Sequence, residues 1–257
     1  MKRAILSLAL FFAVQMLAAL AAAAYMLACG KEILADTDAF AIAVGNALLF
    51  GNIFLVAILA VRPLRRVGTH TITNRFLFDR RNIILSALAI LILALGETMF
   101  LAPLGLDDSD TERLFAAMTT SPLCLINIIV AGPVAEEFVF RRGMLGGLLA
   151  RGIKPWVAVF ASALCFAAVH GNLTQAPPAF ISGMLLGIVY IRSRSLMPCV
   201  VAHIANNTGA LLSLAYPAME DTLVSQHPAV LLGGGLLLAG IAFALVFRMK
   251  PYADRNN

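Results

Sequence analysis

The sequence consists of apolar runs of about 20 residues, separated by short stretches that carry most of the charged side chains. A run of this length can cross the roughly 30 Å hydrocarbon core of a bilayer as an α-helix. In lipid, only helices and closed barrels satisfy their own backbone groups, and these runs lack the polar alternation of barrel strands. The pattern therefore predicts an all-α protein with several transmembrane helices.

The composition excludes the soluble classes of protein. Hydrophobic residues make up 61% of the 257 residues and charged residues only 13%, whereas a soluble domain averages about 25% charged residues. This ratio argues against a cytosolic enzyme, a disordered chain and a disulfide scaffold. We expect residues 1–257 to form a single integral membrane domain with short loops.

Charge clusters divide the chain into about eight predicted spans. They cover residues 5–28, 40–61, 83–106, 122–149, 155–170, 179–191, 197–216 and 228–247. The first run follows Lys2 and Arg3 as a signal peptide would, but it is longer than the usual 7–15-residue apolar region of a signal. We therefore expect it to be a membrane helix.

The basic residues predict the orientation of these spans. If both termini are cytoplasmic, all but two of the 19 basic residues lie on that side, including Arg141, Arg142 and the arginines within 62–81. The other side keeps Lys31, Arg113 and most of the carboxylates. This asymmetry predicts an N-in, C-in topology. Because the basic residues return at every second loop and form no continuous stripe, the net charge of +5 does not indicate nucleic-acid binding.

Ionisable residues inside the spans are the best candidates for function, because each costs about 2.5–3.5 kcal/mol at the centre of a membrane helix. Glu137 and Arg141 are four residues apart and can pair on one helix face, while Glu136 points about 100° away. Glu97 has no partner within its own run, and its role is left open.

Two further spans carry polar groups at helical spacing. Phe166 and His170 share one helix face, and so do His203 and Asn207. Two imidazoles, a carboxylate and a carboxamide form a plausible hydrolytic set. A carboxylate can act as a general base on water, and imidazole and amide groups can donate hydrogen bonds to a developing oxyanion.

Three motifs follow one another on successive predicted helices: Glu-Glu-x-x-x-Arg at 136–141, Phe-x-x-x-His at 166–170 and His-x-x-x-Asn at 203–207. In this order they resemble the motifs of the CPBP family, which comprises the type II CAAX prenyl endopeptidases and the bacteriocin-processing or Abi-type membrane proteins. The resemblance covers a motif-bearing core at about 120–220.

The resemblance implies an intramembrane glutamic endopeptidase. Glu136 would activate water, and His170 would help to hold that water. His203 and Asn207 would form the oxyanion site. The supporting residues would be Glu137, Arg141 and Phe166.

The implied partner is a membrane-embedded, leader-bearing or lipid-modified peptide or protein, which would reach the site by diffusion within the lipid bilayer. The Ala- and Leu-rich runs suggest a multi-pass protein of the bacterial inner (cell) membrane. There the substrate would be a bacteriocin-type precursor or the sorting signal of an exported protein.

Two alternatives use the same residues for other chemistry. Glu136, His170 and His203 could ligate zinc with an open fourth position, although the chain lacks an HExxH motif and the spacing requires no cofactor. Intramembrane glutamate and histidine also suit a transporter, a proton relay or a non-catalytic immunity protein, but no inverted repeat favours a transporter.

The four cysteines show no CxxC spacing and are expected to be small buried hydrophobes. A bridge between Cys29 and Cys124 is left open.

Straight helices over the predicted spans do not bring the candidate catalytic residues together. At 1.5 Å per residue, Glu136 and His203 both lie about 9 Å from the cytoplasmic face, whereas His170 lies about 22 Å from it. Tilted helices, or helices that continue through residues 142–154, would be needed to close this gap.

Overall fold

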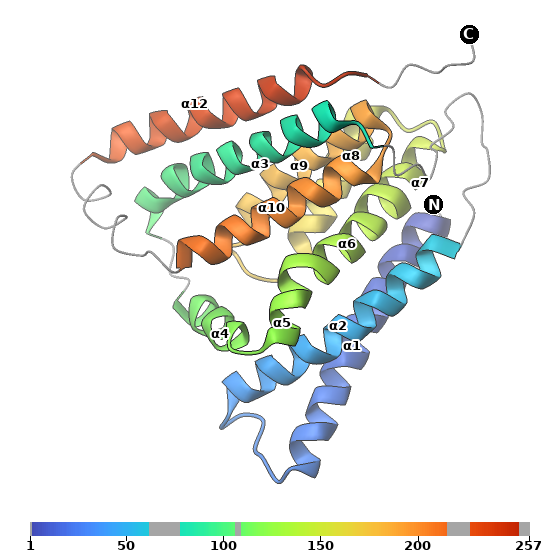
Figure 1. Cartoon of the computed structure of the whole chain (residues 1–257), viewed down its shortest axis with the longest axis vertical. Helices are drawn as coiled ribbons and strands as arrows, with labels where there is room; N and C mark the ends of the chain where they lie inside the picture. The colour runs from blue at the N-terminus through green and yellow to red at the C-terminus, as the bar shows by residue number, and fades with distance from the viewer. Residues whose placement is uncertain (1, 62–77, 106–108, 215–226, 252–257) are drawn as a thin grey trace.

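The computed structural model describes residues 2–61, 78–105, 109–214 and 227–251 (Figure 1). Within these ranges the chain is helical apart from short connections, and it holds no strand. The principal helices outside the glutamate motif are α1 (Lys2–Ala28), α2 (Thr37–Val61), α3 (Arg80–Leu101), α4 (Ser109–Thr119), α8 (Pro155–Ala168), α9 (Ala176–Ser193), α10 (Leu196–Leu214) and α12 (Pro228–Phe247). A short helix, η1 (Ala102–Leu104), extends α3. The all-α prediction is confirmed.

Among the residues that the structure describes, six helical segments are long and apolar enough to cross a membrane. They are Ala4–Ala28, Thr37–Val61, Arg80–Leu104, Pro122–Leu149, Ala176–Ser193 and Pro228–Phe247. The apolar helix Pro155–Ala168 is shorter. Large side chains such as Phe12, Phe54 and Leu237 remain exposed on the outside of the bundle, as lipid-facing positions require. The protein is thus an integral, multi-pass membrane protein, while the count of eight spans and the N-in, C-in orientation stay predictions.

Some of the sequence predictions fall outside the described residues. These are the predicted span ends at 106 and 216, and the arginines among residues 62–77.

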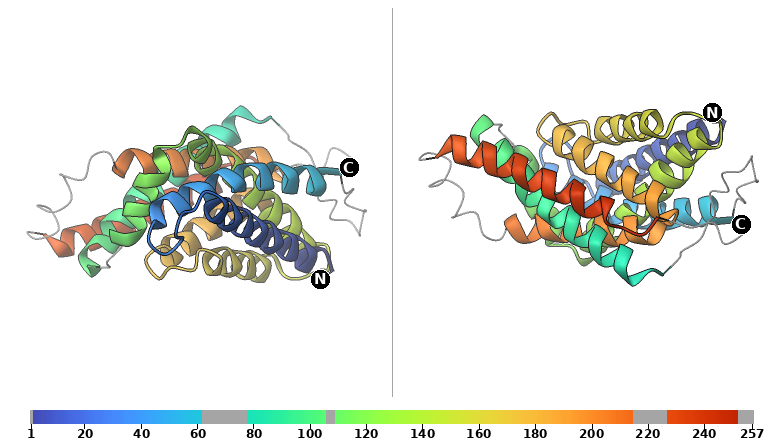
Figure 2. Two further views of the ribbon diagram at one scale, coloured as in Figure 1. Left: turned by 90° about the horizontal axis from the view of Figure 1, so that it is seen from below. Right: turned by 90° about the horizontal axis from the view of Figure 1, so that it is seen from above.

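The helices form two groups with the glutamate-bearing segment between them. α3 lies beside α12 and α10 along one side of the bundle, as Figures 1 and 2 show. α1 and α2 pack together as a hairpin at the other side. The segment Pro122–Leu149 contacts α1 and α2 as well as α10 and α8. It is therefore positioned from both sides.

This segment is one continuous helix built from five parts. They are α5 (Pro122–Ile126), η2 (Asn127–Ala131), α6 (Gly132–Glu136), η3 (Glu137–Leu145) and α7 (Gly146–Leu149). Both η2 and η3 are π-helical, with wider turns than an α-helix. Such turns occur frequently at functional sites.

Arg141 and Arg142 lie inside this helix and are buried, with exposed fractions of 1% and 5%. The Arg142 guanidinium donates to the Leu59 carbonyl near the end of α2 and lies over the Phe138 ring. These two arginines therefore bind groups within the helix bundle and do not lie in a loop. Their assignment to the cytoplasmic side stays a prediction.

Small residues let α1 approach the glutamate helix closely. A Cβ atom at Gly143 would lie 2.2 Å from Ser7 Oγ, and one at Gly147 would lie 3.7 Å from Ala4 Cβ. Gly96 of α3 and Gly235 of α12 are in similarly close contact. Glycine at these positions therefore allows the helices to pack closely.

All four cysteines are free, so the Cys29–Cys124 bridge is not formed. Cys124 and Cys199 are buried as expected, whereas Cys29 is exposed.

Candidate active site

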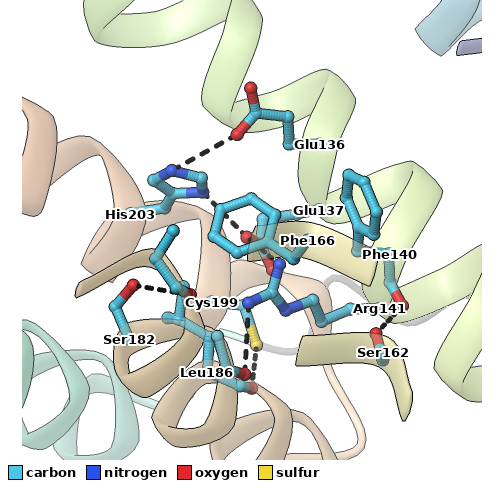
Figure 3. A network of polar contacts seen from close by, with 12 residues as sticks. Glu136, Glu137, Phe140, Arg141, Ser162, Phe166, Ser182, Leu186, Cys199 and His203 are labelled. Atoms are coloured by element: carbon cyan, nitrogen blue, oxygen red, sulfur yellow. Dashed lines mark hydrogen bonds and ion pairs between the residues drawn. The ribbon is translucent and has the colours of Figure 1, made fainter. Parts of the chain in front are cut away.

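The first and third motifs meet at one imidazole ring (Figure 3). Glu136 is the last residue of α6, Glu137 is the first of η3, and His203 lies on α10. His203 Nδ1 is 2.8 Å from Glu137 Oε1, and His203 Nε2 is 3.5 Å from Glu136 Oε2. The two adjacent carboxylates therefore face opposite nitrogens of the same ring.

The predicted pair of Glu137 and Arg141 is present. Arg141 Nη1 lies 3.1 Å from Glu137 Oε1, and the exposed fractions of the two side chains are 1% and 0%. Arg141 Nη2 also donates to the Gly183 carbonyl of α9 at 3.3 Å. This pairing compensates both charges in an interior where an unpaired charge would be costly.

The buried pair orients His203. Because Arg141 pairs with Glu137 as a carboxylate, Glu137 Oε1 acts as an acceptor and His203 Nδ1–H as the donor. The ring then presents Nε2 to Glu136. The Glu136 side chain is 24% exposed and that of Glu137 is 0% exposed. Of the two carboxylates, only Glu136 is accessible to a water molecule or a substrate.

The Phe166 ring on α8 connects all three motifs. The Arg141 guanidinium lies 4.7 Å from its centroid, a cation–π contact. The rings of His203 and His170 meet Phe166 in T-shaped contacts with centroid distances of 5.7 Å and 4.9 Å, and Phe140 packs against it at 5.2 Å. Phe166 is therefore the apolar centre of the candidate site.

His170 lies just beyond α8, and its Nδ1 is 2.8 Å from the Phe166 carbonyl. Since a carbonyl only accepts, Nδ1 donates this hydrogen bond, and Nε2 takes no part in it. Through Phe166 the structure brings His170 beside His203. No hydrogen bond or ion pair joins His170 to Glu136 among the described residues.

The structure closes the gap between Glu136 and His170 that straight spans left open, since His203 and Phe166 link the two residues. The helix continues beyond Glu136 to Leu149, a distance of about 20 Å at 1.5 Å per residue. α8 begins at Pro155, and His170 lies about 22 Å from this start by the same count. The two counts agree because the chain stays helical through Arg141 and Arg142, as one of the two expected ways to close the gap requires.

Asn207 does not contact either glutamate through a hydrogen bond in the described chain. Its Nδ2 donates to the Ile128 carbonyl in η2 at 2.9 Å, and its Oδ1 lies 3.5 Å from Asn206 Nδ2. Only one of the two N–H groups of the Asn207 amide is needed for the Ile128 contact.

Sequence reasoning missed several residues that support the site. Asn52 Nδ2 donates to Asn127 Oδ1 at 2.9 Å, and Ser162 Oγ donates to the Phe140 carbonyl at 2.8 Å. All three polar side chains are buried. Asn52 and Asn127 interrupt apolar runs, so the cost of buried polar groups could have identified them as candidates.

Glu97 is buried on α3, with an exposed fraction of 8%. Its Oε1 has no hydrogen-bond partner among the described residues. Its role remains unassigned.

No group of three or more His, Cys, Asp or Glu side chains in the described ranges could hold a metal ion. The zinc alternative, which needs Glu136, His170 and His203 as ligands, therefore gains no support from the geometry. Catalysis without a cofactor stays a prediction.

The fold and the candidate site define a multi-pass membrane protein with a cluster of glutamate, histidine and arginine at the centre of its helices. Residues 118–209, which include all three motifs, match the family model described as type II CAAX prenyl endopeptidase Rce1-like. The resemblance that the motifs predicted is thereby confirmed for this part of the chain.

Two bacterial proteins are similar to this chain. The putative membrane peptidase YdiL of Bacillus subtilis is 24% identical over 135 residues, which cover 52% of this chain and 55% of that protein. The membrane-embedded CAAX protease MroQ of Staphylococcus aureus is 26% identical over 103 residues, or 38% of this chain and 42% of that one. The chain thus matches only about half the length of these relatives. No solved structure matches it.

Proposed function

We propose that this protein is an intramembrane endopeptidase in which Glu136 activates the attacking water. The observation that carries the proposal is the arrangement around His203, whose ring lies between the accessible Glu136 and the buried Glu137. A base that can meet water, beside an imidazole whose orientation is set by a second carboxylate, is suited to general acid–base hydrolysis.

In this mechanism Glu136 takes a proton from water as the water attacks the scissile carbonyl, and later delivers that proton to the leaving amine. His170 Nε2, which the contact with the Phe166 carbonyl does not use, helps to hold the water. His203 Nε2–H, in the imidazolium form, and the second N–H of Asn207 donate to the oxyanion. Glu137 and Arg141 keep His203 in position.

The proposed substrate is a peptide segment that is embedded in the membrane, preceded by a leader or modified with a lipid. The family description and the relatives' printed names support a membrane peptidase. In a bacterium this activity would process exported-protein sorting signals or bacteriocin-type precursors.

A cleavage assay in proteoliposomes tests the proposal with two fluorophore–quencher peptides. One is a transmembrane peptide with an unmodified leader, and the other ends in a prenylated CAAX sequence. We expect wild-type protein to cleave at least one peptide, and Glu136→Gln to reduce kcat at least 100-fold. His203→Ala and His170→Ala should also lose activity. Cleavage by all three variants at the wild-type rate would contradict the mechanism.

The matched control is Glu112→Gln, the same substitution at an exposed position on α4, which should leave cleavage unchanged. Dialysis against a chelator, followed by metal analysis, separates this mechanism from the zinc alternative, since a metal-free protein should keep its activity. Membrane proteins that accumulate uncut in a deletion strain would identify the natural substrate.

A further inference from the structure

One backbone carbonyl in the glutamate helix lacks a helical donor. The N–H of Gly132 donates to the Asn127 carbonyl, five residues earlier, which is the pattern of a π-helix. The next residue, Pro133, has no N–H. Within η2 and α6, the Ile128 carbonyl therefore has no backbone donor at either the fourth or the fifth residue that follows it.

Asn207 supplies the missing donor from a different helix. Its Nδ2 lies 2.9 Å from the Ile128 oxygen. In the interior of a membrane protein no bulk water is present to bind such a carbonyl, so leaving it unsatisfied is costly. The side chain of Asn207 thus replaces a hydrogen bond that the proline removes.

The same π-helical turn is held from its other side. Asn52 of α2 donates to the Asn127 side chain at 2.9 Å, and these two residues are 3% and 6% exposed. α2 and α10 therefore both bind η2 through amide groups. This turn comes immediately before α6, which ends at Glu136. The contacts to η2 consequently influence where Glu136 lies.

We infer that Asn207 is a positioning residue that compensates for Pro133 and sets the approach of Glu136 to His203. Asn207 follows His203 by one helical turn, so α10 binds the glutamate helix at two points, at Ile128 and at the carboxylates. The inference deepens the proposed function. Its prediction for the cleavage rate rests on that function, whereas its prediction for thermal unfolding does not.

The test is a double-mutant cycle with Asn207→Leu, Pro133→Ala and both together, in the full-length protein in detergent. Asn207→Leu removes the donor and keeps a side chain of similar size. We expect it to lower the midpoint of thermal unfolding by about 3–6 °C. It should also lower kcat about 10- to 100-fold, with KM nearly unchanged, because Glu136 is displaced.

Pro133→Ala should reverse most of the stability loss and the part of the kcat loss that comes from the displacement of Glu136, because alanine provides an N–H in the helix that can donate to the Ile128 carbonyl. The part of the kcat loss that comes from the missing oxyanion donor should remain. Pro133→Ala alone should unfold within about 2 °C of the wild type. The control is Thr208→Ala, whose hydroxyl donates to Ile204 within its own helix at 2.8 Å. The effect of Thr208→Ala, whatever its size, should not be changed by Pro133→Ala.

If the double variant unfolds at the same temperature as Asn207→Leu, the inference is overturned. If stability returns but cleavage does not, the positioning contact is supported, and the remaining loss belongs to the oxyanion role of the second Asn207 N–H. If the wild type cleaves neither peptide, the proposed function loses its support, while the thermal cycle still decides the inference.

Discussion

His203 and Glu137 are joined by a 2.8 Å hydrogen bond from Nδ1 to a carboxylate that is completely buried. The same Glu137 oxygen lies 3.1 Å from Arg141 Nη1. One atom of Glu137 therefore links the imidazole on α10 to a guanidinium in η3, the helix that carries Glu137 itself. Because the bond engages Nδ1, it leaves Nε2 on the side of Glu136. The second glutamate of the motif therefore determines how the first one meets the histidine.

This relationship predicts that the two adjacent glutamates differ in their contributions to stability. Glu136→Gln should change the free energy of unfolding by less than about 0.5 kcal/mol, because its side chain is partly exposed and has only a 3.5 Å contact. Glu137→Gln should lower it by about 3–5 kcal/mol, because Arg141 then remains buried without a counter-ion. Chemical unfolding in detergent measures both. Equal losses for the two variants would refute the distinction.

Removing both charges of the buried pair should cost less stability than removing one. Replacing a whole buried ion pair with neutral groups is often neutral, whereas a single unpaired charge is strongly destabilising. We expect Glu137→Gln combined with Arg141→Met to be more stable than either single variant by about 1–3 kcal/mol. A double variant no more stable than Glu137→Gln would show that the charges are not coupled.

Phe166→Leu should reduce activity more than stability. The substitution keeps an apolar side chain but removes the ring that contacts Arg141 and both imidazoles. We expect the free energy of unfolding to fall by about 1–2 kcal/mol. The measured quantities are kcat and the unfolding midpoint. The matched control is Phe160→Leu on the same helix, whose ring contacts Phe180 away from the site. If Phe160→Leu reduces kcat as strongly, Phe166 has no special role.

Gly143→Ala should destabilise the contact between α1 and η3. The new Cβ would lie 2.2 Å from Ser7 Oγ, and such overpacking typically costs about 1–3 kcal/mol. Adding Ser7→Gly should recover part of this loss by removing the clashing side chain. Gly240→Ala on α12 is the control, because no atom lies within 4 Å of its added Cβ. It should be neutral or raise stability by up to about 1 kcal/mol. Thermal unfolding of the four proteins decides the prediction.

Much of the architecture could be predicted from local patterns. The apolar runs indicated helices because lipid requires every backbone group to be satisfied within its own segment. The pairing of Glu137 with Arg141, and that of Phe166 with His170, follow from residues four apart on a helix. These contacts need no knowledge of neighbouring helices.

Contacts between helices could not be predicted in the same way. The span over residues 122–149 was predicted, but the depth count of about 9 Å for Glu136 took the membrane face to be at Arg142. In the structure both arginines are buried inside a helix that continues to Leu149. Only contacts with neighbouring helices decide that charged side chains are buried there, so the count placed Glu136 and His170 too far apart. The contact between Asn207 and the Ile128 carbonyl was also missed. That carbonyl lacks a backbone donor only because the helix makes a π-helical turn there and is followed by Pro133.

By itself, the sequence determined the class of structure, the motif residues and their pairing within each helix, since these depend on spacing along one chain segment. The tertiary structure decided that His203 lies between Glu136 and Glu137, that Phe166 joins both imidazoles, and that Asn207 binds Ile128. Each of these contacts depends on how far one helix is shifted and rotated against another. That register is set by many packing contacts at once, such as Ser7 against Gly143, and no single stretch of sequence specifies it.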